Sequence, residues 1–181
     1  NPAYIRLADV DGSGTSDIIY FGKNKCSIYF NRQGNSLSDV KGIEPFPEIN
    51  ELTTVDIADL LGTGLSCIVW NSPLQKDLAQ PSKYIDLMNS RKPHVMTGYE
   101  NNMGKKVSLE YTASTQFYLQ DKMAGRPWIT KLHFPVHCIS KSTTKDLVEG
   151  TVFTSSYTYH HGYYDHHEKE FRGFGMVEQA D

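Results

Sequence analysis

Short runs in which apolar and polar residues alternate dominate this chain, and that period of two predicts strands. Val107, Leu109 and Tyr111 alternate with polar residues, as in a half-buried strand. The pattern predicts further strands over residues 4–8, 18–21, 84–88, 128–141, 151–161 and 171–179, with a turn over 162–165. No segment has a convincing amphipathic helical period. The sequence therefore predicts an all-β protein.

An internal repeat organises the first part of the chain. Residues 7–19 match residues 57–69 at an offset of 50, which lies within the usual period of propeller blades. Gly12 and Gly14 recur as Gly62 and Gly64. We therefore expect two β-propeller-like repeats over residues 1–73, of which the second is degenerate. A connecting region over 74–105 then leads to long antiparallel strands over 106–181.

The first repeat contains a loop with the spacing of a calcium ligand set. Oxygen-bearing side chains stand at loop positions 1, 3, 5 and 9, with a glycine at position 6, and this spacing wraps a loop around a hard cation. Position 12 is Tyr20 instead of the glutamate of an EF-hand, and both flanks have strand patterns. A structural calcium ion in a hairpin is predicted, and the alternative is a turn rich in Asp and Gly that binds no ion. The candidate ligands are Asp9, Asp11, Ser13, Thr15 (through its carbonyl) and Asp17.

The second copy of this loop has lost two of the carboxylates. Leu61 stands in place of Asp11, and Cys67 stands in place of Asp17. Since calcium affinity follows the number of charged ligands, we expect this loop to keep its turn shape without binding an ion.

Histidines near the C-terminus form the other candidate site. His160, His161, His166 and His167 lie close to Asp165 and Glu168. Neighbouring residues of a strand point to opposite faces, so His160 and His161 are poor partners for one ion, whereas His161 and His166 could meet across the predicted turn. A zinc site needs three ligands, and a solvated hairpin is the simpler interpretation.

Composition narrows the function classes. The 181 residues carry a formal charge of -3, which gives no reason to expect nucleic-acid binding. Three widely spaced cysteines form neither a disulfide framework nor a metal-ligand pair. No apolar run approaches the length of a membrane span, and no signal peptide is visible. Because the chain begins without Met inside a strand pattern, we interpret it as part of a longer protein.

Several motifs together resemble the B component of insecticidal toxin complexes (Tc toxins) and the related Salmonella-plasmid virulence protein B type. Each motif is weak alone, but their order and number are specific. They include Arg-Pro-Trp-Ile at 126–129 and Tyr-His-His-Gly at 159–162. The full set covers residues 84–88, 91–94, 101–104, 109–112, 114–119, 126–132, 134–137, 159–165 and 170–178.

The resemblance implies a non-catalytic structural and assembly role. It places FG-GAP-like propeller repeats before the first strands of an Rhs-type β-shell that encloses a toxic effector. It also implies two partners, an A-type pore-forming subunit and a C-type subunit that carries the effector, and it implies secretion. Nucleic-acid binding and direct membrane insertion are not expected. Two alternatives stay open from the residues. One is a calcium-dependent adhesive or carbohydrate-binding propeller module, and the other is a histidine-based metallohydrolase.

Overall fold

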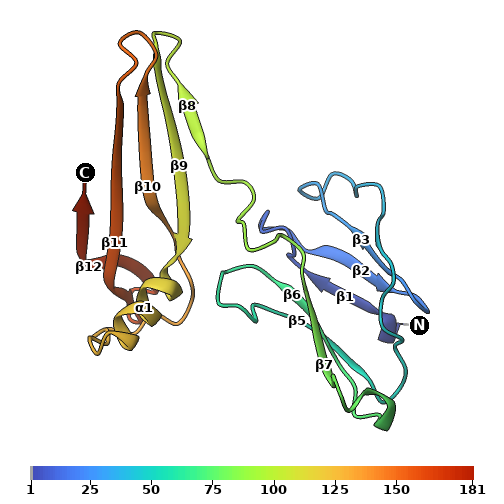
Figure 1. Ribbon diagram of the computed structural model, residues 1–181. Helices are drawn as coiled ribbons and strands as arrows, with labels where there is room; N and C mark the ends of the chain where they lie inside the picture. The colour runs from blue at the N-terminus through green and yellow to red at the C-terminus, as the bar shows by residue number, and fades with distance from the viewer. Residues whose placement is uncertain (1) are drawn as a thin grey trace. The chain divides into compact units, whose positions relative to one another are not determined.

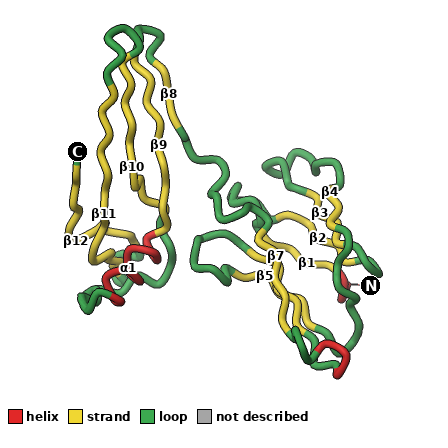
Figure 2. Tube along the Cα trace, viewed as in Figure 1, coloured by secondary structure: helices red, strands yellow, loops and turns green. Residues whose placement is uncertain are grey.

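The computed structural model describes residues 2–181, which divide into two compact units (Figure 1). Unit 1 comprises the chain up to Leu61 together with Leu65–His94. Unit 2 comprises Gly62–Gly64 together with Val95–Asp181. Strands account for most of the regular structure in both, which confirms the all-β prediction (Figure 2). No helix in the described part of the chain is long and apolar enough to cross a membrane.

Unit 1 consists of two antiparallel sheets. The first has four strands in sequence order, and the second has three. Short 3-10 helices occur at Pro2–Tyr4 and Gln75–Asp77. The strands of the first sheet are β1 (Ile5–Ala8), β2 (Asp17–Phe21), β3 (Cys26–Tyr29) and β4 (Lys41–Ile43), and those of the second are β5 (Thr54–Ala58), β6 (Cys67–Asn71) and β7 (Ser82–Asp86).

The sequence repeat corresponds to a repeated hairpin. Leu7 pairs with Ile18 between β1 and β2, and the equivalent pair between β5 and β6 is Ile57 with Ile68. The four glycines of the two loops all have positive φ, at 70° and 86° in the first loop and 65° and 78° in the second. Glycine adopts such angles without a steric cost, so both loops keep one backbone shape although their side chains differ.

Both hairpins of unit 1 contribute to one hydrophobic core. Ile19 is fully buried on β2, and Trp70 on β6 is 4% exposed. The indole of Trp70 donates a hydrogen bond to the Glu48 carbonyl at 3.2 Å, which satisfies its one polar group. The buried members of this core are Val10, Ile19, Phe21, Cys26, Ile28, Phe46, Val55, Ile68 and Trp70.

Unit 2 is a five-stranded antiparallel sheet with one helix. The strand order is β12-β11-β10-β9-β8, so β12 and β8 form its edges (Figure 1). The strands are β8 (Gly98–Glu100), β9 (Lys105–Ala113), β10 (His137–Asp146), β11 (Val152–Asp165) and β12 (Glu170–Ala180). Helix α1 (Ser114–Met123) follows β9 directly and packs on β11.

The helix corrects the sequence-based expectation of no helix. Within α1, Phe117 and Asp121 are buried one turn apart, and Ser114 is buried at its start. Leu119 and Met123 are exposed, so apolar residues occupy both faces and the helical period is masked. Phe117 packs with Trp128 and Cys138 in the core of unit 2.

Two predicted boundaries in unit 2 are also wrong. The predicted strand over 128–141 begins only at His137. The turn expected over 162–165 lies four residues later, because β11 continues to Asp165. Gly162 is required inside this strand, since a Cβ there would lie 2.9 Å from Leu132 and Trp128 side-chain atoms. The glycine therefore permits close packing and does not mark a turn.

Candidate functional site

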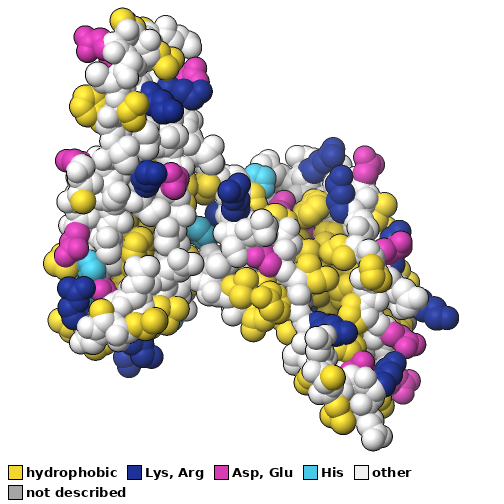
Figure 3. Space-filling view, in the orientation of Figure 1, with side chains coloured by type: hydrophobic (Ala, Val, Ile, Leu, Met, Phe, Trp, Pro, Cys, Tyr) yellow, Lys and Arg dark blue, Asp and Glu magenta, His cyan; other side chains and the backbone are white. Residues whose placement is uncertain are grey.

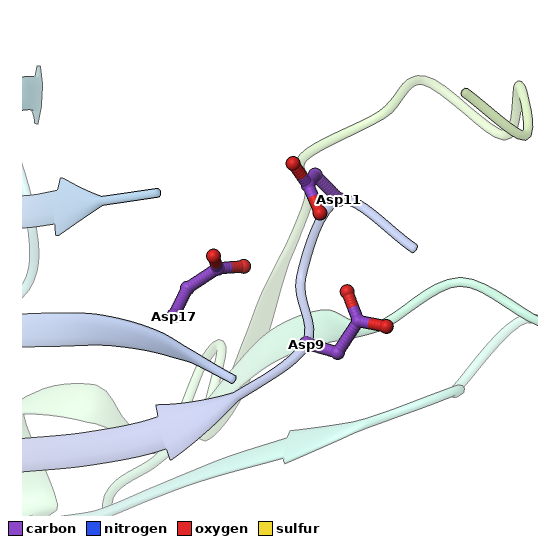
Figure 4. A group of neighbouring side chains, drawn as sticks. All are labelled: Asp9, Asp11 and Asp17. Atoms are coloured by element: carbon purple, nitrogen blue, oxygen red, sulfur yellow. The ribbon is translucent and has the colours of Figure 1, made fainter. Parts of the chain in front are cut away.

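Three carboxylates gather at the loop between β1 and β2 (Figure 4). One oxygen from each of Asp9, Asp11 and Asp17 lies within 4.8 Å of the others. Oxygens that bind one calcium ion at about 2.3–2.6 Å can lie no more than about 5 Å apart. The separation therefore fits a shared ion. It is the one cluster of three such ligands among residues 2–181.

Backbone amides of the loop hold two of these carboxylates in place. Asp9 accepts hydrogen bonds from the amides of Ser13 at 3.0 Å and Gly14 at 2.8 Å. The same Ser13 amide also donates a hydrogen bond to Asp11 Oδ1 at 2.9 Å. The turn therefore fixes its own acidic side chains, in the manner of an Asx-turn.

Asp17 is fully buried at the start of β2. Its Oδ2 accepts a hydrogen bond from the Val10 amide at 3.0 Å, and its Oδ1 accepts one from the Asn31 amide at 2.8 Å. A buried carboxylate needs such partners, because desolvation without them is costly. Asp17 thus joins the loop to the segment after β3, in addition to being a candidate ligand.

Basic side chains from the end of unit 1 also contact this loop. The Lys92 ammonium donates to the Gly12 carbonyl at 3.3 Å, and His94 Nε2 lies 3.7 Å from Asp11 Oδ2. Burial alone would raise the pKa of Asp11, but hydrogen bonds from Ser13 and the neighbouring His94 outweigh it and lower that pKa. Sequence reasoning missed these two residues, because each lies 80 or more positions from the loop residue that it contacts.

The two hydroxyl residues of the predicted ligand set bond to each other. Ser13 Oγ lies 3.0 Å from Thr15 Oγ1, which in turn donates to the Asn31 carbonyl at 3.0 Å. The structure therefore brings the three carboxylates together, while these hydroxyls take part in the hydrogen bonds of the turn.

In the second loop, Cys67 takes the position of Asp17. The thiol is buried, and desolvation together with the nearby Asp86 raises its pKa. The Leu60 amide, which is equivalent to that of Val10, opposes this rise in part, and it donates a hydrogen bond to the Ala58 carbonyl at 3.0 Å. A neutral thiol thus stands where the first hairpin has a buried carboxylate.

The histidines of the C-terminal region do not form one site. His161 Nδ1 accepts a hydrogen bond from the Ile129 amide at 3.2 Å, whereas His166 stacks on His133 with ring centroids 5.6 Å apart. Asp165 accepts the amides of His167 and Glu168 and so closes the turn after β11. The displaced turn removes the reason to expect His161 and His166 to share an ion.

His160, by contrast, is buried in a polar contact that the sequence did not reveal. Its Nδ1 lies 2.5 Å from Asp121 Oδ2, and that oxygen also accepts the Trp128 indole N–H at 2.8 Å. Burial alone would raise the pKa of Asp121, but hydrogen bonds from His160 and Trp128 lower it. No local pattern predicts this contact, because Asp121 lies on a helix 39 positions away.

A cavity of about 400 Å³ lies beside α1 in unit 2. Its hydroxyl groups are partly engaged, because Ser114 Oγ accepts the Val136 amide and Thr130 Oγ1 donates to the Gly162 carbonyl. Most of the surface exposed on the walls is apolar, although several lining residues are polar. The walls are formed by Ser114, Thr115, Tyr118, Trp128, Thr130, Lys131, Leu132, His133 and Phe134.

The ends of two hairpins in unit 2 expose apolar side chains. Met103, in the β8–β9 turn, is 83% exposed, and Val148, in the β10–β11 turn, is 80% exposed. The Leu147 amide donates to the Gly104 carbonyl at 2.7 Å, so the two turns touch. Figure 3 shows hydrophobic side chains at this end of the sheet.

The cysteines are poor nucleophiles. Burial raises the pKa of the Cys26 thiol to about 11 and that of Cys138 to about 12. A thiolate is the reactive form, so both remain protonated at neutral pH.

Comparisons with known proteins agree with the resemblance seen in the sequence. Residues 45–181 match the family model described as the insecticide toxin TcdB middle/N-terminal region. A crystal structure of TcdB2-TccC3 without its hypervariable C-terminal region is similar, with 33% identity and a TM-score of 0.87. The Photorhabdus luminescens Tc holotoxin pore with a TccC3 mutation gives 33% identity and a TM-score of 0.88. Each match covers 99% of this chain and 8% of the other chain. A search of curated proteins found no match.

Proposed function

This chain belongs to the family of insecticide toxin TcdB middle/N-terminal regions, and from that premise we propose that it is a non-catalytic structural and assembly segment of a toxin-complex B-type protein. The observation that carries the proposal is the likeness to the TcdB2-TccC3 structure, which extends over 99% of this chain at 33% identity. The chain spans about 8% of the length of that protein, so its role is that of one part within a larger assembly.

The two units have separate parts in this proposal. Unit 1, with its propeller-like repeats, docks on an A-type pore-forming subunit. Unit 2 contributes to a β-shell that encloses a toxic effector and contacts a C-type subunit. The exposed edges β8 and β12 support this division, since long antiparallel sheets need partners at their edges. The apolar hairpin ends at Met103 and Val148 give the sheet a further contact surface. Secretion of the assembled protein belongs to the same proposal.

A chimera tests this assignment. The segment of TcdB2 that matches this chain is replaced by the chain itself, and the product is co-expressed with TccC3. We expect the chimera to be soluble and to co-purify with TccC3. The control is the same chimera with Trp70→Asp, which places a charge in the core of unit 1 and should prevent a folded product. A chimera that is folded and monodisperse but does not bind TccC3 would contradict the proposal.

The acidic loop has a structural role in this proposal, in which one calcium ion binds among Asp9, Asp11 and Asp17. Their mutual approach within 4.8 Å supports it, because three carboxylates so close repel one another unless a cation is shared. The ion would neutralise this charge and fix the β1–β2 hairpin.

Calorimetric titration of the calcium-stripped chain tests the ion site. One calcium per chain is expected, with a rise in the unfolding free energy of about 2.7 kcal/mol at a concentration 100 times the Kd. Asp11→Ala should abolish both effects. Asp59→Ala is the matched control, because Asp59 stands in the degenerate loop where Asp9 stands in the first loop. Equal calcium binding by wild type and Asp11→Ala would exclude this site.

The acidic loop also favours a second candidate function, a calcium-dependent adhesive module that binds glycans through the ion. The Asp11 side chain is 18% exposed, so an ion held there has some access to solvent. Binding to a glycan array in calcium, lost in chelator and in Asp11→Ala, would favour this module over the structural role.

A further inference from the structure

The cavity beside α1 has a buried aromatic floor and a basic mouth. Its buried lining residues, Ser114 at 2% and Trp128 at 8% exposure, form the floor. Its exposed lining residues, Lys131 and His133, form the mouth. The volume of about 400 Å³ falls within the range of about 300–1,000 Å³ that is typical of small-molecule sites. A ligand that enters therefore meets a basic group first and aromatic surface beneath it.

Contacts within unit 2 hold the aromatic floor in place. The Trp128 indole donates a hydrogen bond to Asp121 Oδ2 at 2.8 Å. Its ring meets the ring of Phe174 edge-on at 6.0 Å and that of Tyr118 edge-on at 5.7 Å between centroids. A Cβ at Gly162 would lie 2.9 Å from the Trp128 ring, so β11 lies directly against it. A ring fixed in this way offers a surface to another ring without rearrangement.

The polar groups that stay available in the cavity are hydrogen-bond donors. Thr115 and Thr130 already donate to backbone carbonyls, and Ser114 Oγ accepts a backbone amide. The Tyr118 hydroxyl and the Lys131 ammonium form no hydrogen bond or ion pair within the described part of the chain. No carboxylate is among the described residues that line the cavity. An ammonium only donates and a phenol also donates, so these groups favour a ligand that carries an acceptor or a negative charge.

The charges close to the cavity point the same way. The Lys122 ammonium lies 5.9 Å from the centroid of the Tyr118 ring, which brings a second cation close to the wall. Asp121 is the carboxylate bonded to the Trp128 indole, but it is buried and also contacts His160 Nδ1. The positive charge at the mouth therefore has no exposed carboxylate of the cavity wall to neutralise it.

We propose that this cavity binds a small aromatic carboxylate, with its ring against Trp128 and its carboxylate beside Lys131 at the mouth. The ring removes apolar surface from water on both sides of the contact. The carboxylate stays near solvent and gains a charge-assisted hydrogen bond, so its desolvation is small. A neutral aromatic compound lacks the second of these contributions, and an aliphatic acid lacks the first.

Calorimetric titration of the full chain with naphthylacetate tests the proposal. We expect one site per chain, and naphthylacetamide, which has the same rings without the charge, should bind about tenfold more weakly, as for the loss of one charge-assisted hydrogen bond. Lys131→Gln should weaken binding of the acid about tenfold and leave binding of the amide unchanged. Lys145→Gln is the matched control, because Lys145 is an exposed lysine of β10 outside the cavity. Both lysines are exposed, so neither change disturbs the core.

Nitrogen-15 NMR of the indole groups locates the ligand. The chain has two tryptophans, Trp70 in unit 1 and Trp128 in unit 2. The Trp128 indole signal should shift as naphthylacetate is added, in step with the calorimetric saturation, and the Trp70 signal should stay in place. In Lys131→Gln the same shift should require about ten times more acid.

Four results would overturn the proposal. The first is the absence of saturable binding, and the second is equal affinity of wild type for the acid and the amide. The third is saturable binding that leaves the Trp128 signal unmoved. The fourth is a blocked peptide of Trp followed by Asp that displaces naphthylacetate and binds far more tightly, since the cavity would then belong to a segment of a polypeptide and not to a free acid.

Discussion

Replacing Asp17 by asparagine separates the structural role of this residue from its role as a candidate ligand. Asp17 is fully buried, and its two oxygens accept the amides of Val10 and Asn31. Asparagine has nearly the same shape but only one acceptor oxygen. One of the two amides would therefore face an NH₂ group instead of an acceptor.

The expected cost follows from the lost hydrogen bond. A hydrogen bond to a charged group contributes about 1.5–3 kcal/mol, so Asp17→Asn should lower the unfolding free energy by about 2 kcal/mol. With a urea dependence of about 2 kcal/mol per molar, the midpoint should fall by about 1 M. Asp9→Asn is the control. The Asp9 carboxylate accepts hydrogen bonds from amides of a more exposed turn, so Asp9→Asn should lower the unfolding free energy by less than about 1 kcal/mol.

The assay is urea unfolding in calcium-free buffer with Trp128→Phe as the background, so that Trp70 is the only tryptophan and reports unit 1. The amide hydrogen bonds are present without any ion, so the loss should appear in chelator. Equal midpoints for Asp17→Asn and the background protein in chelator would refute this reasoning. A loss seen only when calcium is added would show that Asp17 stabilises the hairpin through the ion alone.

Three further predictions concern single residues. Gly14→Ala should cost about 1–2 kcal/mol in urea unfolding, because Gly14 has a φ of 86° although its Cβ would meet no atom within 4 Å. Cys138, whose pKa is raised to about 12, should resist iodoacetamide in the native chain at pH 8 and react after denaturation, as mass spectrometry would show. The pKa of Asp121 is lowered in the folded protein, so its carboxylate stabilises the fold above the ordinary pKa of 3.8, and this stabilisation is lost at lower pH. The difference in unfolding free energy between wild type and Asp121→Asn should therefore shrink below about pH 4.

The repeat and the acidic loop were readable from the sequence because both depend on local spacing. The offset of 50 between the glycine pairs corresponds to two hairpins of equal register. The carboxylates of Asp9, Asp11 and Asp17 meet because one short loop carries them all. The alternating pattern likewise located β9, β11 and β12, whereas β10 begins nine residues later than predicted.

The features that sequence reasoning missed depend on tertiary contacts. Helix α1 shows no clear apolar face, because its buried side includes the polar residues Ser114 and Asp121. The Asp121–His160 contact joins residues 39 positions apart, and Lys92 reaches Gly12 across 80. Gly162 was interpreted as a turn residue, whereas the packing of Trp128 requires it inside β11. No periodic pattern encodes such contacts.

The most direct test of the assembly role is a structure of the chimeric TcdB2, with this chain in place of its matching segment, in complex with TccC3. The account predicts that this chain will be ordered in the map, with further strands of the larger protein paired to edges β8 and β12 of unit 2. An intact complex in which this segment is displaced, with both edges unpaired, would contradict the central claim.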